Sequence, residues 1–543
     1  MRQTILSVVL DVEPQSARRL SGLIEEFKRD QEPPGAAQWY SELKTEVPSL
    51  HFMSMSVFES ASYDPIFVIE ANFDGPPGPF WAQMEAAFGV QLRPMLRCCK
   101  RPADSDGPTY DAVTQPLSLY PLAPYLEKRT LRPSVFHQGN RGLDRDRILS
   151  ERELFLATRE ALAQSSPTEP NPYRSIPAEE IHRKLRAQLL GRFPWLAKPA
   201  PARISRLERL ADWGQLIVFA ILVLFCLSLP GMALAPMTPA GRYIIGLAVA
   251  VILLAILLLR RGAALPGQGV PTRSGGLTLA SLSTATIVAG VLVVVFYVVI
   301  VSAIGIGVAM MLTGLALDDA LKLSVKVVGL GLISAILFTA PMVVVWLRWL
   351  ERRDSSQDAP PVDERLLGEM ARREDWIPQN HMGSVVLVKP GILRTALFRT
   401  GHRGLGLVLR VLATDGYLGS MRTVHFAHWA FVNNGSRLMF FSNFDHSWES
   451  YLDDFIEKAH GGLTLAWGSN VGFPPTRFLM LDGASHGRQF KAWARHSMAV
   501  SRFWYSAYSD LTVDQVERNA RIADGLRKET LSVQEAATWA RDL

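Results

Sequence analysis

The stretch VLVVVFYVVIVSAIGIGVAMML, residues 291–312, carries no charged side chain and decides the fold of this chain. It lies in an apolar block from Trp213 to Leu350, and a helix of about 20 apolar residues crosses the ~30 Å hydrocarbon core of a bilayer. The block holds four runs without Asp, Glu, Lys or Arg, namely Gly214–Gly241, Tyr243–Leu259, Leu277–Leu317 and Val327–Leu347. We therefore predict four transmembrane helices with a polar region on each side, and the lipid bilayer as a partner.

The third run, Leu277–Leu317, would be about 60 Å long as a single helix. It is either one span with an interfacial extension at its Ser- and Thr-bearing start, or a hairpin that turns near Gly305 and Gly307. A turn inside lipid leaves backbone groups unpaired, which favours the single helix.

Basic residues beside the runs predict the orientation. Those on one side are Arg203, Arg206, Arg209, Arg260, Arg261, Arg273, Arg348, Arg352 and Arg353, whereas the opposite loops hold Arg242, Lys322 and Lys326 beside Asp318 and Asp319. Cytoplasmic loops are rich in Arg and Lys, so both termini are predicted to be cytoplasmic. We expect a multi-pass protein of a bacterial inner (cytoplasmic) membrane.

Length and composition limit the remaining classes. At 543 residues the chain has room for two soluble domains besides the membrane block. Much of the net charge of +6 lies beside the membrane, so anionic headgroups explain it better than nucleic acid does. The three cysteines, adjacent Cys98 and Cys99 and the distant Cys226, form no disulfide framework or CxxC motif, which fits a reducing cytoplasm.

Short matches in the same order flank the membrane block and indicate an internal repeat. Val8-Val9-Leu10 resembles Val385-Val386-Leu387, His51-Phe52 matches His425-Phe426, Asn72-Phe73-Asp74 matches Asn443-Phe444-Asp445, and Leu143-Asp144 matches Leu511-Thr512. The offset falls from 377 through 374 and 371 to 368, as expected for related domains that differ by short loop deletions. Because an even number of spans returns the chain to one side, the two copies are expected to associate in the cytoplasm, within one chain or across a dimer.

Each copy is predicted to follow the order strand, helix, strand, strand, helix, strand, which is the ferredoxin-like βαββαβ arrangement. In the first copy these elements are predicted at Thr4–Asp11, Gln15–Phe27, His51–Phe58, Ile66–Asn72, Pro79–Phe88 and Gln91–Cys98. In the second they are predicted at Ser384–Pro390, Arg403–Ala413, Val424–Val432, Arg437–Ser442, Trp448–Ala459 (ended by Gly461-Gly462) and Leu463–Gly468. Further elements are predicted at Ser134–Gln138, Asp144–Leu162, Ala178–Leu190, Arg477–Leu481, Gly487–Ser497, Phe503–Tyr508 and, capped by Thr512 with Gln515, after residue 512.

The predicted fold class is therefore α+β plus membrane helices, with two ferredoxin-like repeats flanking a four-helix transmembrane block. The first copy is placed at residues 1–165, a proline-rich connector at 166–212, the transmembrane domain at 213–350 and a linker at 351–380. The second copy is placed at residues 381–530, followed by a C-terminal tail at 531–543.

One set of residues in the second copy carries a family resemblance. It consists of His425-Phe426-Ala427-His428-Trp429, Ser442-Asn443-Phe444-Asp445, Ser447-Trp448-Glu449-Ser450-Tyr451, Asp454-Phe455-Ile456 and Gly472-Phe473-Pro474-Pro475-Thr476-Arg477. These residues resemble a family of uncharacterised bacterial membrane proteins, over residues 384–527 well and in the first copy only faintly. At the level of fold the chain is similar to the dimeric α/β-barrel superfamily, which includes dye-decolorizing peroxidases, chlorite dismutases and small monooxygenases. That resemblance implies paired units around a barrel-like cavity that often holds haem.

The chain departs from the peroxidase pattern. The GxxDG motif of the dye-decolorizing peroxidases does not occur, and Phe73-Asp74-Gly75 is only a partial echo of it. No residue is therefore carried over from that family as haem ligand, acid or base, because fold alone does not fix function.

The catalytic candidates are His425, Asp445 and Arg477. A neutral His425 could bind haem iron or shuttle protons, or it is a strand histidine with one hydrogen-bonded nitrogen. Asp445 ends a strand before a helix, so it is an acid or base, or else a helix cap. Arg477 either clamps a carboxylate such as a haem propionate or is an ordinary surface arginine.

The ligand-binding candidates are His51, Asp74, His428, Trp429 and Trp448. His51 and Asp74 match His425 and Asp445 in the repeat. His428 follows His425 by three residues, so in a regular strand the two face opposite ways and cannot share a metal without a bulge. The tryptophans either line an apolar ligand cavity or fill the core.

Other chemistries have weak support. The motifs GxxxxGK[ST], GxSxG and HExxH do not occur, and no ionisable residue lies within an apolar run, which disfavours a solute path. The leading interpretation is a membrane-tethered cytoplasmic ligand-binding or interaction module. The alternatives are a haem- or peroxide-linked oxidoreductase using His425 and, third, a small-solute transporter.

Overall fold

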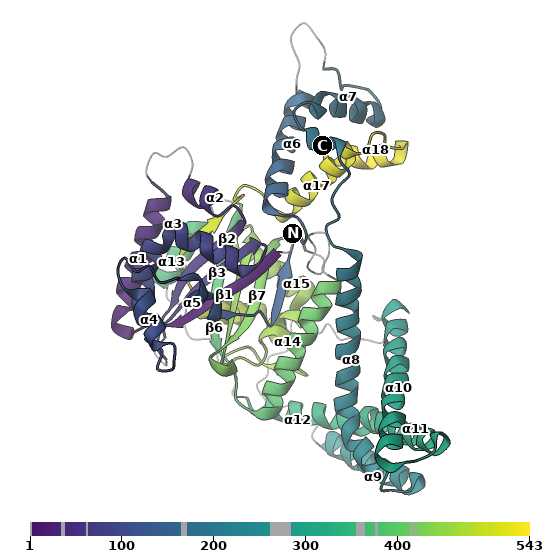
Figure 1. Ribbon diagram of the computed structural model, residues 1–543. Helices are drawn as coiled ribbons and strands as arrows, with labels where there is room; N and C mark the ends of the chain where they lie inside the picture. Colours follow the sequence, from purple (N-terminus) through teal and green to yellow (C-terminus); the bar gives the residue numbers. More distant parts are fainter. Residues whose placement is uncertain are drawn as a thin grey trace.

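The computed structural model describes residues 3–33, 39–60, 63–163, 171–260, 284–354, 364–374, 378–412, 416, 418 and 421–543. Two antiparallel five-stranded sheets lie beside a set of long apolar helices (Figure 1). The prediction of an α+β fold with membrane-type helices is thus confirmed at this level. Arg261, Arg273 and residues 277–283 of the third apolar run lie outside the described residues.

The first sheet is built mainly by the N-terminal part of the chain. Its strand order is β12-β2-β3-β1-β4, with bounds β1 Gln3–Asp11, β2 Leu50–Phe58, β3 Ile66–Asp74, β4 Thr130–Leu131 and β12 Ser501–Ser506. Helices α1 (Ala17–Gln31) and α3 (Pro77–Arg97) cover one face of it. Alternate strand residues such as Phe67 and Phe73 point to that face and share an apolar core with both helices.

The second sheet is built mainly by the C-terminal part. Its strand order is β11-β6-β8-β7-β5, with bounds β5 Val135–Gln138, β6 Gln379–Leu387, β7 Val424–Val432, β8 Arg437–Asp445 and β11 Met498–Ala499. The helices of its apolar core are α14 (Ile392–Leu412), α15 (Trp448–Trp467) and α16 (Gly487–Ser497). The opposite face of each sheet contributes to a shared apolar cluster that includes Val68 and Phe441.

The two halves exchange their edge strands. Strand β5 comes from the N-terminal half but pairs with β7, where Phe136 lies opposite His428. Strand β12 comes from the C-terminal half but pairs with β2, where Trp504 lies opposite Ser54. Residues more than 290 positions apart in sequence are therefore neighbours in each sheet (Figure 1).

Corresponding strands occupy the same places in both sheets. Reading β5-β7-β8-β6-β11 against β12-β2-β3-β1-β4 pairs each strand with its counterpart at nearly constant offset. The predicted Val8/Val385 match is wrong by one residue. Val9, opposite Val68, is the counterpart of Val385, opposite Met439, so the offset there is 376. Since strand faces alternate, a slip of one residue would move every side chain to the other face.

Two predicted strands are wrong. Gln91–Cys98 lies almost entirely in α3, and Leu463–Gly468 lies in or at the end of α15. The predicted stop at Gly461-Gly462 is also wrong, because α15 kinks at Ala459 and then continues to Trp467, whose ring is buried in the core. The fourth strand of each half is instead the two-residue β4 or β11. The predicted strand at Arg477–Leu481 is two short strands, β9 (Thr476–Arg477) and β10 (Leu481–Asp482).

Four helices form a separate lobe beyond one end of the sheets (Figure 1). They are α6 (Arg145–Ala163), α7 (Ala178–Leu190), α17 (Val513–Arg527) and α18 (Val533–Trp539). The predicted bounds of α7 and α16 are confirmed, as is the capping box of Thr512 and Gln515. The remaining helices of five or more residues outside the apolar block are α2 (Ser41–Glu46), α4 (Gly107–Thr114), α5 (Ala123–Lys128) and α13 (Glu364–Glu374).

The apolar block forms the helices α8 (Arg206–Leu234), α9 (Ala240–Arg260), α10 (Thr284–Thr313), α11 (Leu317–Ser334) and α12 (Ala340–Arg353). Among the described residues, three helices are long and apolar enough to cross a membrane, namely Arg206–Leu234, Val288–Thr313 and the continuous Leu317–Arg353. A fourth apolar helix, Ala240–Ile256, is shorter. In the third run α10 passes through Gly305 and Gly307 without a turn and ends at Thr313, so the chain turns at residues 314–316, within the predicted run, before α11 begins at Leu317.

Glycines bring some of these helices close together. A Cβ on Gly331 of α11 would lie 2.3 Å from Met232 Cγ of α8, and one on Gly305 of α10 would lie 2.6 Å from Ser324 Oγ of α11. Gly305 and Gly331 therefore allow close packing of the apolar helices. A Cβ on Gly307 or Gly329 would meet no heavy atom within 4 Å.

Candidate functional site

The paired histidines and aspartates meet at one end of the two sheets. His51, at the start of β2, places Nε2 3.0 Å from Asp74 Oδ2, at the end of β3. The same carboxylate oxygen accepts a hydrogen bond of 2.8 Å from the backbone N–H of Arg145, the first residue of α6. Asp74 therefore both pairs with His51 and caps a helix.

The second half repeats this arrangement. His425 Nε2 lies 2.9 Å from Asp445 Oδ1, and Asp445 Oδ2 accepts a hydrogen bond of 2.8 Å from the backbone N–H of Val513 at the start of α17. Each aspartate therefore accepts from the N-terminus of a helix, but the prediction that it caps the following helix is wrong. The capped helices are α6 and α17, rather than the helices that directly follow each aspartate in sequence.

A glutamine completes each site, and the sequence analysis missed both. Gln3 Nε2 donates to the backbone carbonyls of Leu143 (2.8 Å) and Asn140 (3.4 Å). Gln379 Nε2 donates to the matching carbonyls of Leu511 (2.5 Å) and Tyr508 (3.0 Å). The two glutamines are separated by 376 positions, so the correct repeat offset was the signal that would have found them.

Tyr508 lies between the two pairs and is their main difference. Its hydroxyl is 2.9 Å from His51 Nδ1, and the ring centroids of His51 and His425 lie 5.8 and 6.0 Å from that of Tyr508. The counterpart of Tyr508 in the first half is Asn140, which instead donates to Glu517. Burial raises the pKa of Tyr508 well above its ordinary value, and the charge of Asp74 adds to that shift.

The chemistry open to these pairs is restricted by their surroundings. The side chains of His51, His425 and Asp445 are fully buried, and the Nε2 atom of each histidine already faces a carboxylate. Iron or substrate would have to displace that carboxylate to reach Nε2, whereas Nδ1 of His51 faces Tyr508 and Nδ1 of His425 has no hydrogen-bond partner among the described residues. Within the described residues, no group of three His, Cys, Asp or Glu side chains has the arrangement of a metal site.

A second polar cluster lies between the sheets and is centred on Glu70 of β3. Its carboxylate accepts from Ser54 Oγ (3.0 Å), Asn72 Nδ2 (2.6 Å) and Asn443 Nδ2 (3.2 Å), and it lies 3.3 Å from His381 Nε2. Asn72 and Asn443 are repeat counterparts, so both halves donate to one oxygen. All of these side chains are at most 3% exposed.

The electrostatics of this inter-sheet cluster follow from burial. Burial opposes the charge on Glu70, but the hydrogen bond and charge of His381 outweigh it and lower the pKa of Glu70 to about 2. Burial lowers the pKa of His428 to about 4, although the charge of Glu70 acts in the opposite direction. The cluster thus holds an ionised carboxylate beside a histidine that stays neutral near pH 7.

The other predicted residues do not join the histidine–aspartate pairs. Strand β7 has a bulge between Val424 and Phe426, but the bulge does not bring His428 to the Asp445 partner of His425. His428 Nε2 instead lies 2.8 Å from Ser7 Oγ. Trp429 packs in the helix-facing core against Phe440 and, edge to face, against Trp467. The guanidinium of Arg495 lies over Trp448, with its central carbon 3.7 Å from the centroid of the tryptophan ring.

Arg477 lies where the last apolar helix joins the second half. At the end of β9, it pairs with Asp482 of β10 at 3.3 Å. Glu351, in the last helical turn of α12, is buried against the turn that joins β9 to β10. Its carboxylate accepts from Thr476 Oγ1 (3.0 Å) and from the backbone N–H groups of Phe478 and Leu479 (2.9 Å each).

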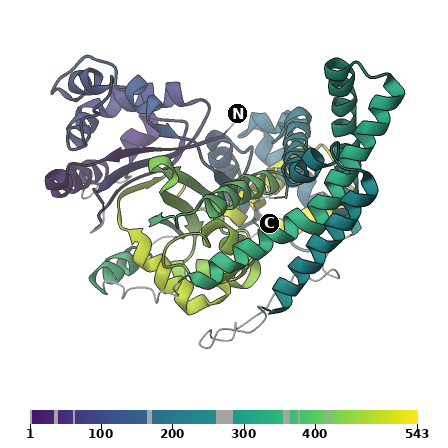
Figure 2. The same ribbon diagram turned by 90° about the horizontal axis from the view of Figure 1, so that it is seen from below.

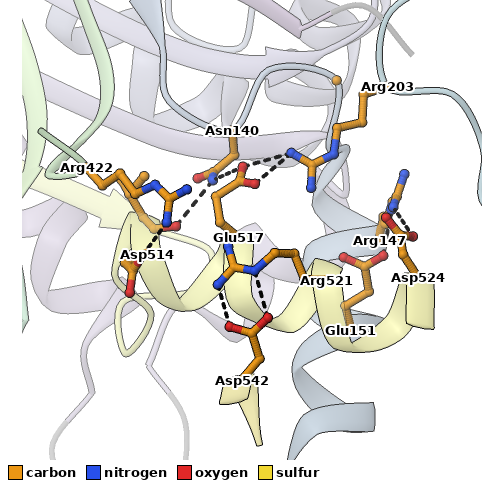
Figure 3. A network of polar contacts seen from close by, with 12 residues as sticks. Asn140, Arg147, Glu151, Arg203, Arg422, Asp514, Glu517, Arg521, Asp524 and Asp542 are labelled. Carbon is orange, nitrogen blue, oxygen red and sulfur yellow. Dashed lines mark hydrogen bonds and ion pairs between the residues drawn. The ribbon is translucent and has the colours of Figure 1, made fainter. Parts of the chain in front are cut away.

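The first apolar helix is fastened in a similar way. Arg141, from the loop after β5, donates to Asp212 (2.7 Å) and Glu208 (2.5 Å) of α8. Just before α8, Arg203 forms two hydrogen bonds, of 3.0 and 2.7 Å, with the buried carboxylate of Glu517 in α17 (Figure 3). Asn140 donates to the same carboxylate at 2.9 Å. Both ends of the apolar block therefore carry carboxylate contacts to the sheet-bearing part of the chain.

Comparison with known proteins gives no assignment. No family model matches the chain, and no curated protein is significantly similar to it. The class of protein defined here is therefore structural: an α+β body with two strand-exchanged sheets, joined to long apolar helices.

Proposed function

We propose that this chain is a membrane-tethered cytoplasmic interaction module. Its two related, ferredoxin-like halves form one body, and four transmembrane helices hold that body at the inner membrane with both termini in the cytoplasm. The observation that carries the proposal is the fastening of both ends of the apolar block to the body, through Asp212 and Glu517 at the entry and Glu351 at the exit.

The exchange of strands supports an even number of crossings. Because β5 and β12 each complete the sheet of the other half, both halves lie on one side of any membrane that the chain spans. Three long apolar helices would leave them on opposite sides, so the shorter α9 supplies the fourth crossing. Its 21 residues rise about 31 Å as a helix, which matches the hydrocarbon core.

An exposed apolar loop supports a role in interaction. Between α4 and α5, Leu117 is 87% exposed, Leu119 is 99% exposed and Tyr120 is 48% exposed. Leu117 also holds a positive φ of 58°, a conformation that is costly for a leucine. Adjacent apolar side chains held out in water are typical of a contact surface for another macromolecule.

A haem-linked oxidoreductase is less well supported by the geometry. His425 and His51 direct Nε2 at aspartates that cap helices, and the polar groups between the sheets bond mainly with one another. The purified protein should therefore have no Soret band. A Soret band that is lost in His425→Ala would overturn the proposal in favour of the oxidoreductase.

Topology and contact are tested separately. Cysteines at Glu59 and Ser436, exposed positions at the outer ends of β2 and β7, should both react with a membrane-impermeant maleimide only in inside-out vesicles. Reaction from opposite sides would end the proposal. A photo-crosslinking amino acid at Leu119 should give a discrete protein adduct in cells, whereas one at the exposed control Ser436 should give none. Equal adducts at both sites would contradict a contact surface at the loop.

A further inference from the structure

A cavity opens between the apolar helices α8, α10 and α11. Its volume is about 230 Å³, and its lining is almost entirely apolar. Met232 contributes from α8, Gly305 and Val308 from α10, and Leu323 and Val327 from α11. The site is separate from the histidine–aspartate pairs and from the Glu70 cluster, and the sequence analysis did not identify it.

Its shape follows from small residues at the contact of α10 with α11. Gly305 has no side chain, and Ser324 on the facing helix turns its hydroxyl to the backbone carbonyl of Ser302 at 2.9 Å. Thr313, at the end of α10, donates to the carbonyl of Ala309. Both hydroxyls on the lining are therefore already hydrogen-bonded.

The lining determines which occupant fits. An ordered buried water needs two to four polar partners, and this cavity offers no such set from its lining residues. At about 230 Å³ it is smaller than the ~300–1,000 Å³ typical of pockets for drug-sized ligands. An apolar chain fits these limits better than a polar solute or a whole small molecule.

The surroundings say where that chain comes from. Side chains of α10 at or beside the cavity, Ile304, Met311 and Leu312, are 61%, 86% and 77% exposed, as expected for helix faces that contact lipid. Lys322 of α11 follows the turn between α10 and α11, and its largely exposed ammonium lies 3.3 Å from the carboxylate of Asp318 and 3.8 Å from that of Asp319. In the proposed topology this turn lies on the non-cytoplasmic side.

We propose that this cavity holds one acyl chain of a phospholipid from the non-cytoplasmic leaflet, with Lys322 near the headgroup phosphate. The inference rests on the proposed membrane topology and adds a lipid-binding site to it. The chain buries its methylene groups against Val308, Val327 and Met232, beside the close contact of α10 with α11 at Gly305.

The test compares phospholipid retained by the full-length protein after exchange into a mild detergent, measured as phosphate per chain and by native mass spectrometry. The wild type should keep about one phospholipid. Ala309 is a half-buried residue of the cavity lining, so Ala309→Phe places a ring in the cavity and should reduce retention several-fold. Val299→Phe, on the exposed surface of the same helix outside the cavity, should retain as much phospholipid as the wild type.

Equal retention in wild type and Ala309→Phe, with unchanged circular dichroism and thermal unfolding, would overturn the inference. So would a wild type that keeps no phospholipid. Those results leave the maleimide labelling at Glu59 and Ser436 unaffected, so failure of the lipid site is distinguishable from failure of the topology. Reduced retention in Lys322→Gln, with hydrocarbon binding unchanged, would identify the headgroup contact.

Discussion

The two halves of the molecule share their strand order but differ at the centre of the inter-sheet face. At the ends of the strands, the glutamine, histidine and aspartate that hold α6 are repeated around α17. In the middle, Glu70 has Phe441 as its counterpart, and His381 and His428 have Ile5 and Ser54. The repeated groups build the scaffold, whereas the unrepeated charges meet at one place between the sheets.

Seen from below, the two sheet-bearing halves lie side by side, with the long apolar helices to one side of them (Figure 2). The polar cluster centred on Glu70 thus joins the halves from within, while the carboxylates of Asp212 and Glu351 join them to the helices. If the halves serve only as one rigid body, changes at these groups should alter stability and assembly before they alter any chemistry.

The largest effect is expected from Glu70→Ala. It removes the carboxylate that Asn72, Asn443 and Ser54 bond, and leaves His381 without its acidic partner. Breaking such a buried network should cost about 3–5 kcal/mol, measured as thermal unfolding of the purified protein by tryptophan fluorescence. Glu70→Gln, which keeps one acceptor oxygen, should lose clearly less. A stable Glu70→Ala variant would show that the halves do not depend on this cluster.

Low pH should also reduce the stability of the folded protein strongly. Burial lowers the pKa of His137, His402 and His428 to about 4 from an ordinary value of 6.5. The unfolded chain therefore binds more protons below pH 6.5, and stability should fall as the pH drops from about 6.5 to 4. Each histidine contributes up to about 3 kcal/mol to that loss.

The contribution of Glu70 to stability changes in a lower pH range. Its pKa is held at about 2 in the folded protein against an ordinary value of 4.5, so its stabilising contribution is present above pH 4.5 and is lost as the pH falls toward 2. His428→Gln should reduce the pH dependence of the unfolding temperature between 6.5 and 4, while His137 and His402 maintain the rest of it. An unchanged slope in the upper window would contradict a buried neutral His428.

A smaller and equal effect is expected from the two aspartates. Asp74→Ala and Asp445→Ala should each destabilise the protein by about 2 kcal/mol, because each leaves a buried histidine nitrogen and a helix N–H without an acceptor. Asp510→Ala, at a partly exposed site, is the matched control. If Asp445→Ala left stability unchanged while Asp74→Ala reduced it, the halves would not be equivalent.

The smallest effect is expected at the helix caps. Thr512 Oγ1 accepts from the backbone N–H of Gln515, and Asp144 Oδ1 accepts from that of Arg147. Thr512→Ala and Asp144→Ala should each cost about 1 kcal/mol, seen as a lower unfolding temperature. A loss several times larger at only one of the two would indicate that the lobe of α6 and α17 is held asymmetrically.

Local patterns identified many elements. The helices Ala178–Leu190 and Gly487–Ser497 and the capping box of Thr512 with Gln515 were correctly predicted, because spacing and caps act over a few positions. The error at Gln91–Cys98 has a local cause as well. Leu92, Met95 and Leu96 stand at helical spacing and are buried, so the segment continues α3 although it contains Pro94.

Long-range features were not predictable from the residues that form them. Strand β5 has four residues, and no signal within it indicates that its partner is β7, almost 290 positions later. The histidine–aspartate pairs were found as aligned candidates, but their contacts depend on where α6 and α17 begin in space. Glu70 was overlooked although it interrupts an apolar strand, since its four partners come from four different strands, two in each half.

The exchange of edge strands is the central claim, and one disulfide tests it most directly. Ser56 of β2 and Ser501 of β12 are cross-strand partners, with their Oγ atoms 3.3 Å apart. In membranes containing the full chain with Cys226→Ser, the pair Ser56→Cys and Ser501→Cys should oxidise within one chain. The pair Ser56→Cys and Ser436→Cys should not. Failure of the first pair to crosslink, or crosslinking only between two chains, would contradict a single body closed by its own exchanged strands.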